Sequence, residues 1–187
     1  MKFKVFNTLS YIGEKLNNSN VEWGVGASIL LNHYGIIDKP NDIDILVNIK
    51  DIEKVDEILK SIGEKKVWEK SEAYSTKYFY EYIINCFDID VMSGLSINHD
   101  KGIYKYIFDN SSVSEFKKIK GVSIPLTSLE DWYVIYQLIP CREAKVKMIE
   151  DYLLSNGIQK PDLLERALRN DLPIEVRYRV ERILNGY

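Results

Sequence analysis

The stretch Trp23-Gly-Val-Gly-Ala-Ser-Ile-Leu-Leu31, followed after a loop by Asn41-Asp-Ile-Asp-Ile-Leu-Val47, decides the fold of this chain. It reads as a short strand, a turn of small residues, a helix and a second strand. Successive side chains of a strand alternate between faces, so Asp42 and Asp44 point to one side while the isoleucines beside them point into the core. The segment therefore predicts two neighbouring carboxylates beside a glycine turn.

A second Asp-Ile-Asp run, at Asp88 and Asp90, falls on a later predicted strand. Carboxylates gathered from two strands repel one another unless a cation lies between them, and oxygen ligands suit Mg²⁺ or Mn²⁺. We therefore expect Asp42, Asp44 and Asp90 to be the metal-binding and catalytic residues. We choose Asp90 over Asp88 because Asp90 lies closer to the end of the strand, where open sites commonly form.

These motifs resemble the signature of the polymerase-beta-like nucleotidyltransferase superfamily. That signature is a Gly-Gly or Gly-Ser turn, a hydrophobic-Asp-hydrophobic-Asp strand and a third acidic residue on a later strand. The chain is most similar to small bacterial members related to aminoglycoside nucleotidyltransferases and AbiEii-type toxins. The likeness is good over residues 20 to 95 and looser beyond. It departs at Ala27, where a second Gly or a Ser is usual, and at Tyr136, where the toxins carry a Lys.

The resemblance implies a magnesium-dependent nucleotidyltransferase that moves a nucleoside monophosphate from a nucleoside triphosphate to a hydroxyl of a small molecule, a tRNA or a protein. It places the triphosphate on the turn at Gly26, Ala27 and Ser28, since free amides at a helix start bind phosphate. Lys77 is a further candidate for the triphosphate, with a solvated lysine as the alternative. The Ser28 hydroxyl could donate to phosphate, and a role as helix cap or first-turn residue is equally compatible with its position.

The altered helical motif leaves a second interpretation open. A catalytically weakened module that binds a nucleotide or a partner would keep the same fold. Arg142 and Lys145 lie three residues apart on one predicted helix and would supply either a basic site for nucleotide or a structural salt bridge. The acceptor, the choice of nucleotide and the oligomeric state are not determined by any pattern in the sequence.

Composition limits the classes of function. With 187 residues, of which 45% are hydrophobic and 28% charged, the chain can build one sizeable core with a helical appendage. A net charge of −3 argues against a surface dedicated to nucleic acid; RNA is unsupported, although a local basic patch could hold it. Cys86 and Cys141 show no metal or disulfide spacing, and no signal peptide or membrane span is evident, so we expect a cytoplasmic protein with no membrane partner.

Periodicity and turn residues predict an α+β fold, with a mixed sheet, helices on one side and a C-terminal helical subdomain. We divide the chain into a nucleotidyltransferase-like domain over residues 1–124 and a helical subdomain over 125–187. The predicted helices comprise one carrying Val5, Leu9, Ile12 and Leu16, and others over 27–34, 51–62, 129–138, 142–155, 160–169 and 173–184. The predicted strands cover 21–26, 43–47, 65–70, 74–84 and 86–92, with weaker signals at 103–108 and 122–124.

Overall fold

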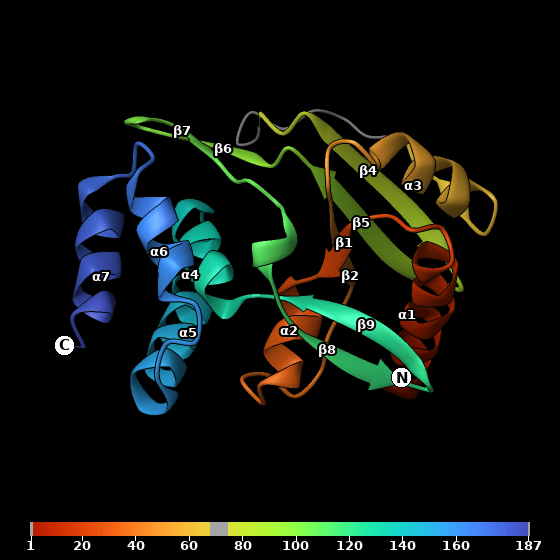
Figure 1. Cartoon of the computed structure of the whole chain (residues 1–187), viewed down its shortest axis with the longest axis horizontal. Helices are drawn as coiled ribbons and strands as arrows, with labels where there is room; N and C mark the ends of the chain where they lie inside the picture. Colours follow the sequence, from red (N-terminus) through yellow and green to blue (C-terminus); the bar gives the residue numbers. More distant parts are fainter. Residues whose placement is uncertain (1, 68–74, 187) are drawn as a thin grey trace.

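A mixed seven-stranded sheet forms the centre of the protein, with strand order β3-β4-β5-β2-β1-β9-β8 (Figure 1). The computed structural model describes residues 2–67 and 75–186. The strands of this sheet are β1 (Trp23–Val25), β2 (Ile43–Val47), β3 (Glu64–Lys65), β4 (Tyr78–Ile84), β5 (Phe87–Ser93), β8 (Val113–Ile119) and β9 (Val122–Thr127). A separate hairpin of β6 (Ser96–His99) and β7 (Gly102–Lys105) extends from the sheet towards the C-terminal helices.

Helices flank the sheet in two groups. The first comprises α1 (Lys2–Asn17), α2 (Ala27–His33) and α3 (Ile52–Lys60), and the second comprises α4 (Leu129–Leu138), α5 (Glu143–Asn156), α6 (Pro161–Leu168) and α7 (Ile174–Leu184). The apolar stripe predicted for the first helix is buried, because α1 packs it against β9 and α3. The second group packs together beside the sheet (Figure 1).

Helix α4 joins the helical group to the sheet. Its N-terminus is capped by Ser128, whose hydroxyl accepts a hydrogen bond from the amide of Asp131 at 3.1 Å. The indole of Trp132 donates to the hydroxyl of Thr127 at 2.8 Å, and that hydroxyl donates to the carbonyl of Val25 at 3.1 Å. This buried chain of bonds fixes α4 to the end of β1, where the glycine turn begins.

The expected fold class, α+β with a mixed sheet, is confirmed. Several strand expectations differ from the structure. The strand predicted over 65–70 is limited to β3 in the described residues, and 68–70 lie outside them. The strand predicted over 74–84 begins at Tyr78, and residue 74 lies outside the described part. The first part of the weak signal at 103–108 belongs to β7, which forms a two-stranded sheet with β6 among the described residues.

Strand β8 was not predicted. Four of its five middle residues are polar and the fifth, Phe116, is exposed, because β8 is the last strand of the sheet and pairs with β9. Strand β9 runs past Pro125 to Thr127, beyond the point where we expect the helical subdomain to begin. The division of the chain into two domains remains a prediction.

Within the described residues no helix is both long enough and apolar enough to cross a lipid bilayer.

Candidate functional site

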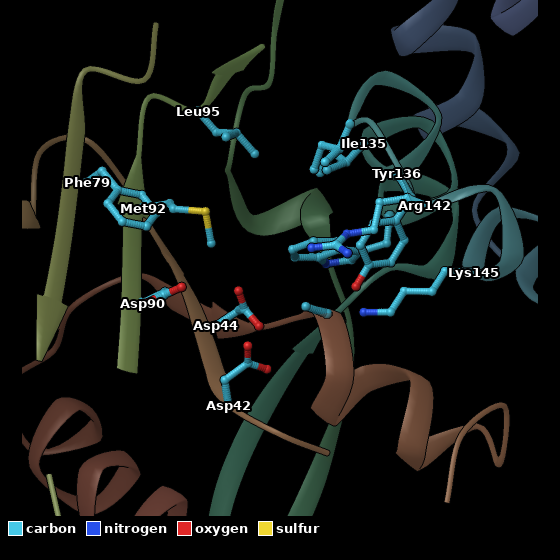
Figure 2. Close-up of a pocket in the computed structure, with 13 residues that line it drawn as sticks. Asp42, Asp44, Phe79, Asp90, Met92, Leu95, Ile135, Tyr136, Arg142 and Lys145 are labelled. Atoms are coloured by element: carbon cyan, nitrogen blue, oxygen red, sulfur yellow. The ribbon is translucent and has the colours of Figure 1, made fainter. Parts of the chain in front are cut away.

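Neighbouring strands bring the aspartates together. Strands β2 and β5 pair in parallel, and the register places Asp44 directly beside Asp90. Side chains in register on adjacent strands lie on the same face of the sheet. Asp42 precedes β2 by one residue and points to the same face as Asp44 (Figure 2). The parity argument from the sequence therefore holds, and the three predicted carboxylates face one space.

That space is a cavity of about 220 Å³ between the sheet and the helical group. One side is acidic, the opposite side carries two cations and the remainder is apolar (Figure 2). The residues that line it are Ala27, Asp42, Asp44, Phe79, Asp90, Met92, Leu95, Trp132, Ile135, Tyr136, Ile139, Arg142 and Lys145.

The acidic wall brings carboxylates close together and away from water. Burial, followed by the charges of Asp42 and Asp90, raises the pKa of Asp44 well above its ordinary value. Burial also raises the pKa of Asp90 to about 6, with Glu81, Asp42 and Asp88 adding to the effect. Both shifts have the same physical cause, because removing water and adding like charge disfavour the ionised form. A cation bound between these carboxylates would instead favour their ionised forms.

The carboxylate oxygens at this site fit a magnesium or manganese ion whose coordination is completed by the substrate. Asp42 and Asp44 offer hard carboxylate oxygens from one strand, with Asp90 beside them. Among the described residues no group of three or more His, Cys, Asp or Glu side chains meets in ready metal-ligand geometry. Mg²⁺ commonly takes one or two carboxylates together with phosphate oxygens, so a ready-made cage of protein ligands is not required.

Ser28 positions Asp42. Its buried hydroxyl donates to the carboxylate of Asp42 at 2.9 Å and lies 3.1 Å from the carbonyl of the same residue. The sequence predicts a phosphate contact or a cap for this hydroxyl. In the structure its acceptor is instead Asp42, a candidate metal ligand. Ser28 thus fixes the rotamer of Asp42.

The glycine turn is shaped by packing. The amide of Gly26 donates to the carbonyl of Asp44 at 3.0 Å, which leaves the amides of Ala27 and Ser28 as candidate phosphate donors on this turn. A Cβ atom at Gly26 would lie only 2.2 Å from the indole nitrogen of Trp132. Gly26 is therefore required for the approach of Trp132 to the sheet.

Two cationic side chains, Lys145 on α5 and Arg142 directly before it, face the aspartates. Arg142 and Lys145 line the cavity, and the structure records no ion pair for either side chain within the described residues. Burial and the neighbouring Arg142 lower the pKa of Lys145, and the charges of Asp42 and Asp44 oppose the effect. Of the two roles left open by the sequence, the structure gives no support to the structural salt bridge.

Tyr136 lies beside these cations. It is buried, lines the cavity and has the ammonium of Lys145 5.0 Å from its ring centroid. The helix after α4 thus places a cation over this aromatic ring, at the edge of the cavity.

Lys77 and Asp88 lie outside the cavity. Lys77 is exposed just before β4 and does not line the cavity, so the structure does not bring it to the aspartates. Asp88 has 65% of its side chain exposed and forms an ion pair with Lys66 at 2.5 Å. The choice of Asp90 over Asp88 agrees with this placement, but its reason was wrong, because Asp90 lies in the middle of β5 and Asp88 lies closer to an end.

Sequence reasoning missed residues that approach the site from other elements. Glu81 on β4 pairs in register with Asp90, and Trp132 and Ile135 of α4 line the cavity. The Glu81 register could have been found by counting back from the hairpin turn between β4 and β5. Nothing local marks Trp132 or Ile135, because their position depends on how α4 packs against the sheet.

Comparison with known proteins gives a fold. No family model and no curated protein sequence matches the chain. A crystal structure from Thermotoga maritima assigned as a nucleotidyltransferase is 24% identical, with a TM-score of 0.61 over 80% of this chain and 92% of that one. The antibiotic-resistance factor ANT(2'')-Ia is 17% identical, with a TM-score of 0.60 over 90% and 93%.

A third similar structure is the lincosamide antibiotic adenylyltransferase LnuA with lincomycin bound. It is 18% identical and has a TM-score of 0.53 over 76% of this chain and 94% of that one. ANT(2'')-Ia has also been solved with adenylyl-2''-tobramycin. These likenesses confirm the resemblance to the nucleotidyltransferase superfamily at the level of the fold.

Proposed function

We propose that this protein is a nucleotidyltransferase that moves a nucleoside monophosphate from a nucleoside triphosphate to an acceptor hydroxyl. The observation that carries the proposal is the cavity in which Asp42, Asp44 and Asp90 face Arg142 and Lys145. A magnesium triphosphate is the ligand that needs both halves, because carboxylates hold its metal and cations neutralise its phosphates.

Asp42 and Asp44 would hold the Mg²⁺ or Mn²⁺ ion, and Ser28 keeps Asp42 oriented for that task. When bound, such an ion polarises phosphate oxygens and stabilises charge on the attacking and leaving oxygens. Arg142 and Lys145 bind the β- and γ-phosphates from the opposite wall. The amides of Ala27 and Ser28 are the candidate donors at the start of α2, as the sequence motif suggests.

Asp90 orients the acceptor hydroxyl. In the attack the hydroxyl oxygen bonds to the α-phosphorus, the bond from that phosphorus to the bridging oxygen breaks, and pyrophosphate leaves. The hydroxyl proton passes to a carboxylate, and Asp90 is the candidate for this role because it lies in register beside Asp44 and lines the same cavity. Asp90 is also the predicted third ligand of the metal.

The rival interpretation is a module that binds nucleotide without efficient transfer. The cation of Lys145 beside Tyr136 favours the enzyme, because the charge missing from α4 is supplied by α5. The enzyme and a nucleotide-binding module both require triphosphate binding, and they differ in whether the α-phosphate is transferred. A module that binds a partner would require neither.

The test is incubation with each α-labelled triphosphate and Mg²⁺, with pooled small metabolites, RNA or the protein itself as acceptors. We expect label in a phosphodiester product and release of pyrophosphate. Asp90→Asn should lower the rate by at least about 100-fold, the usual worth of a positioned general base. Asp88→Asn is the matched control on the same strand and should keep most of the activity.

Binding of the triphosphate without labelled product from any acceptor pool would favour the weakened module. Release of inorganic phosphate alone would indicate a triphosphatase. Equal losses of rate in Asp90→Asn and Asp88→Asn would remove Asp90 from the proposed reaction.

A further inference from the structure

The cavity has a third kind of lining that the proposed reaction does not use. Five side chains form an apolar wall: Phe79 on β4, Met92 on β5, Leu95 after β5, and Ile135 and Ile139 at α4. Met92, Leu95 and Ile135 are buried, and the other two are half-buried. Figure 2 shows Phe79, Met92 and Leu95 on the sheet side of the cavity, with Ile135 across from them on α4.

The apolar wall begins at Asp90. Met92 follows Asp90 by two residues on β5, so both side chains lie on the same face of the sheet. Phe79 is the cross-strand partner of Met92, and it extends this apolar surface onto β4. A hydroxyl held at Asp90 therefore has the rest of its molecule against Phe79, Met92 and Leu95.

Under the proposed function, the triphosphate occupies the end of the cavity away from the apolar wall. Its metal lies at Asp42 and Asp44, and its phosphates face Arg142 and Lys145. Among the described residues that line the cavity, the aspartates are the only carboxylates, and the metal takes up their charge. Glu81 lies beside Asp90 on β4 but does not line the cavity, so a polycationic acceptor would meet apolar side chains on the wall beyond Asp90 and would be repelled by the two cations.

We infer that the acceptor is a hydroxyl compound with an uncharged, apolar body, which packs against the apolar wall while Asp90 holds its hydroxyl. This inference rests on the proposed function and adds the chemical class of the acceptor. Apolar lining with a small number of placed polar groups is the usual construction of a small-molecule subsite.

The test uses saturation-transfer NMR on the full chain with Mg²⁺ and a non-hydrolysable triphosphate present. The probes are 4-phenyl-1-butanol, as the apolar alcohol, and tobramycin, as the polycation. We expect the alcohol to bind, and Phe79→Glu to weaken its binding about tenfold or more through lost apolar contact and an added charge. Triphosphate affinity, measured separately by calorimetry, should stay unchanged.

Ile83→Glu is the matched control, since Ile83 lies on the same strand and the same face as Phe79 but is exposed and outside the cavity. It should leave binding of the alcohol unchanged. If circular dichroism shows that Phe79→Glu does not fold, Ile139→Glu makes the same test from α4.

Three results would overturn the inference while leaving the proposed function standing. They are tighter binding of tobramycin than of the alcohol, absence of alcohol binding while triphosphate is bound, and equal weakening of alcohol and triphosphate by Phe79→Glu. The last would assign the apolar wall to the nucleobase. Failure of the wild-type protein to bind triphosphate would instead remove the proposed function and this inference with it.

Discussion

Ala27 has a backbone conformation that its side chain disfavours. Its φ angle is 44°, in the left-handed region, and it is the first residue of α2 and part of the cavity lining. A Cβ atom makes this conformation unfavourable by roughly 1–2 kcal/mol, and glycine adopts it readily. The turn therefore keeps its shape with Ala at a strained position.

Replacing Ala27 by Gly should relieve this strain. Part of the gain is offset by the greater freedom of Gly in the unfolded chain. We expect Ala27→Gly to change the free energy of unfolding by between zero and about 1 kcal/mol in the stabilising direction. Urea unfolding measures the change. Ala144→Gly, in the ordinary backbone of α5, is the control and should be destabilising; a larger loss at Ala27 than at Ala144 would contradict the strain.

The raised pKa of Asp90 should make stability depend on pH. Burial and neighbouring carboxylates raise this pKa from 3.8 to about 6, so the folded protein holds a proton that the unfolded chain releases. Stability from this group is full below about pH 4 and is lost as pH rises towards 6. Without metal, wild type should therefore lose stability relative to Asp90→Asn across this range, by at most about 1.4 kcal/mol per pH unit.

Unfolding by urea at several pH values provides the comparison. Asp88→Asn gives the background for removing a carboxylate from the same strand, because Asp88 is mostly exposed and lies outside the cavity. A difference between wild type and Asp90→Asn that stays constant from pH 4 to pH 6 would show that Asp90 is not the group that titrates there.

At the scale of elements, the hairpin of β4 and β5 carries one side of the site. Its two turn residues, Asn85 and Cys86, have φ angles of 51° and 65°. Positive φ at both central residues is typical of a type I′ turn, which favours Asn followed by Gly. The turn sets the register that pairs Phe79 with Met92 and Glu81 with Asp90.

Cys86→Gly should stabilise this hairpin. The change produces the preferred Asn-Gly turn and removes the side chain from a left-handed backbone, so we expect a gain of about 0.5–1 kcal/mol in the free energy of unfolding. Cys86→Ala is the control, because it removes the thiol and keeps the Cβ atom. Equal effects of the two substitutions would mean that the thiol, and not the backbone, determines stability here.

At the scale of the whole molecule, the sequence predicted the features that depend on residues close together in the chain, such as the face on which a side chain lies. The alternation in Asp42-Ile-Asp44 placed both carboxylates on one face, and the parallel register of β2 and β5 brought Asp90 beside them. The buried stripe of α1 and the cap at Ser128 follow from spacing and residue type in the same way.

What the sequence could not predict depends on contacts between distant segments. Strand β8 is defined by its pairing with β9, because its apolar residues, Val113, Phe116 and Ile119, do not alternate along the chain as those of a half-buried strand would. The exposed position of Lys77 follows from where β4 starts, and the position of Lys145 opposite Asp42 follows from how α5 packs. The approach of Trp132 to Gly26 likewise joins segments more than a hundred residues apart.

The central claim is that Asp42, Asp44, Arg142 and Lys145 bind a metal triphosphate in one cavity, and it is tested most directly by calorimetric titration. Transfer assays depend on finding the acceptor, whereas binding does not. A non-hydrolysable triphosphate is titrated into the protein with and without Mg²⁺, for wild type, Asp44→Asn and Asp88→Asn. We predict Mg²⁺-dependent binding by wild type and Asp88→Asn, and its loss in Asp44→Asn. Binding that is independent of Mg²⁺ and equal in all three proteins would contradict the claim.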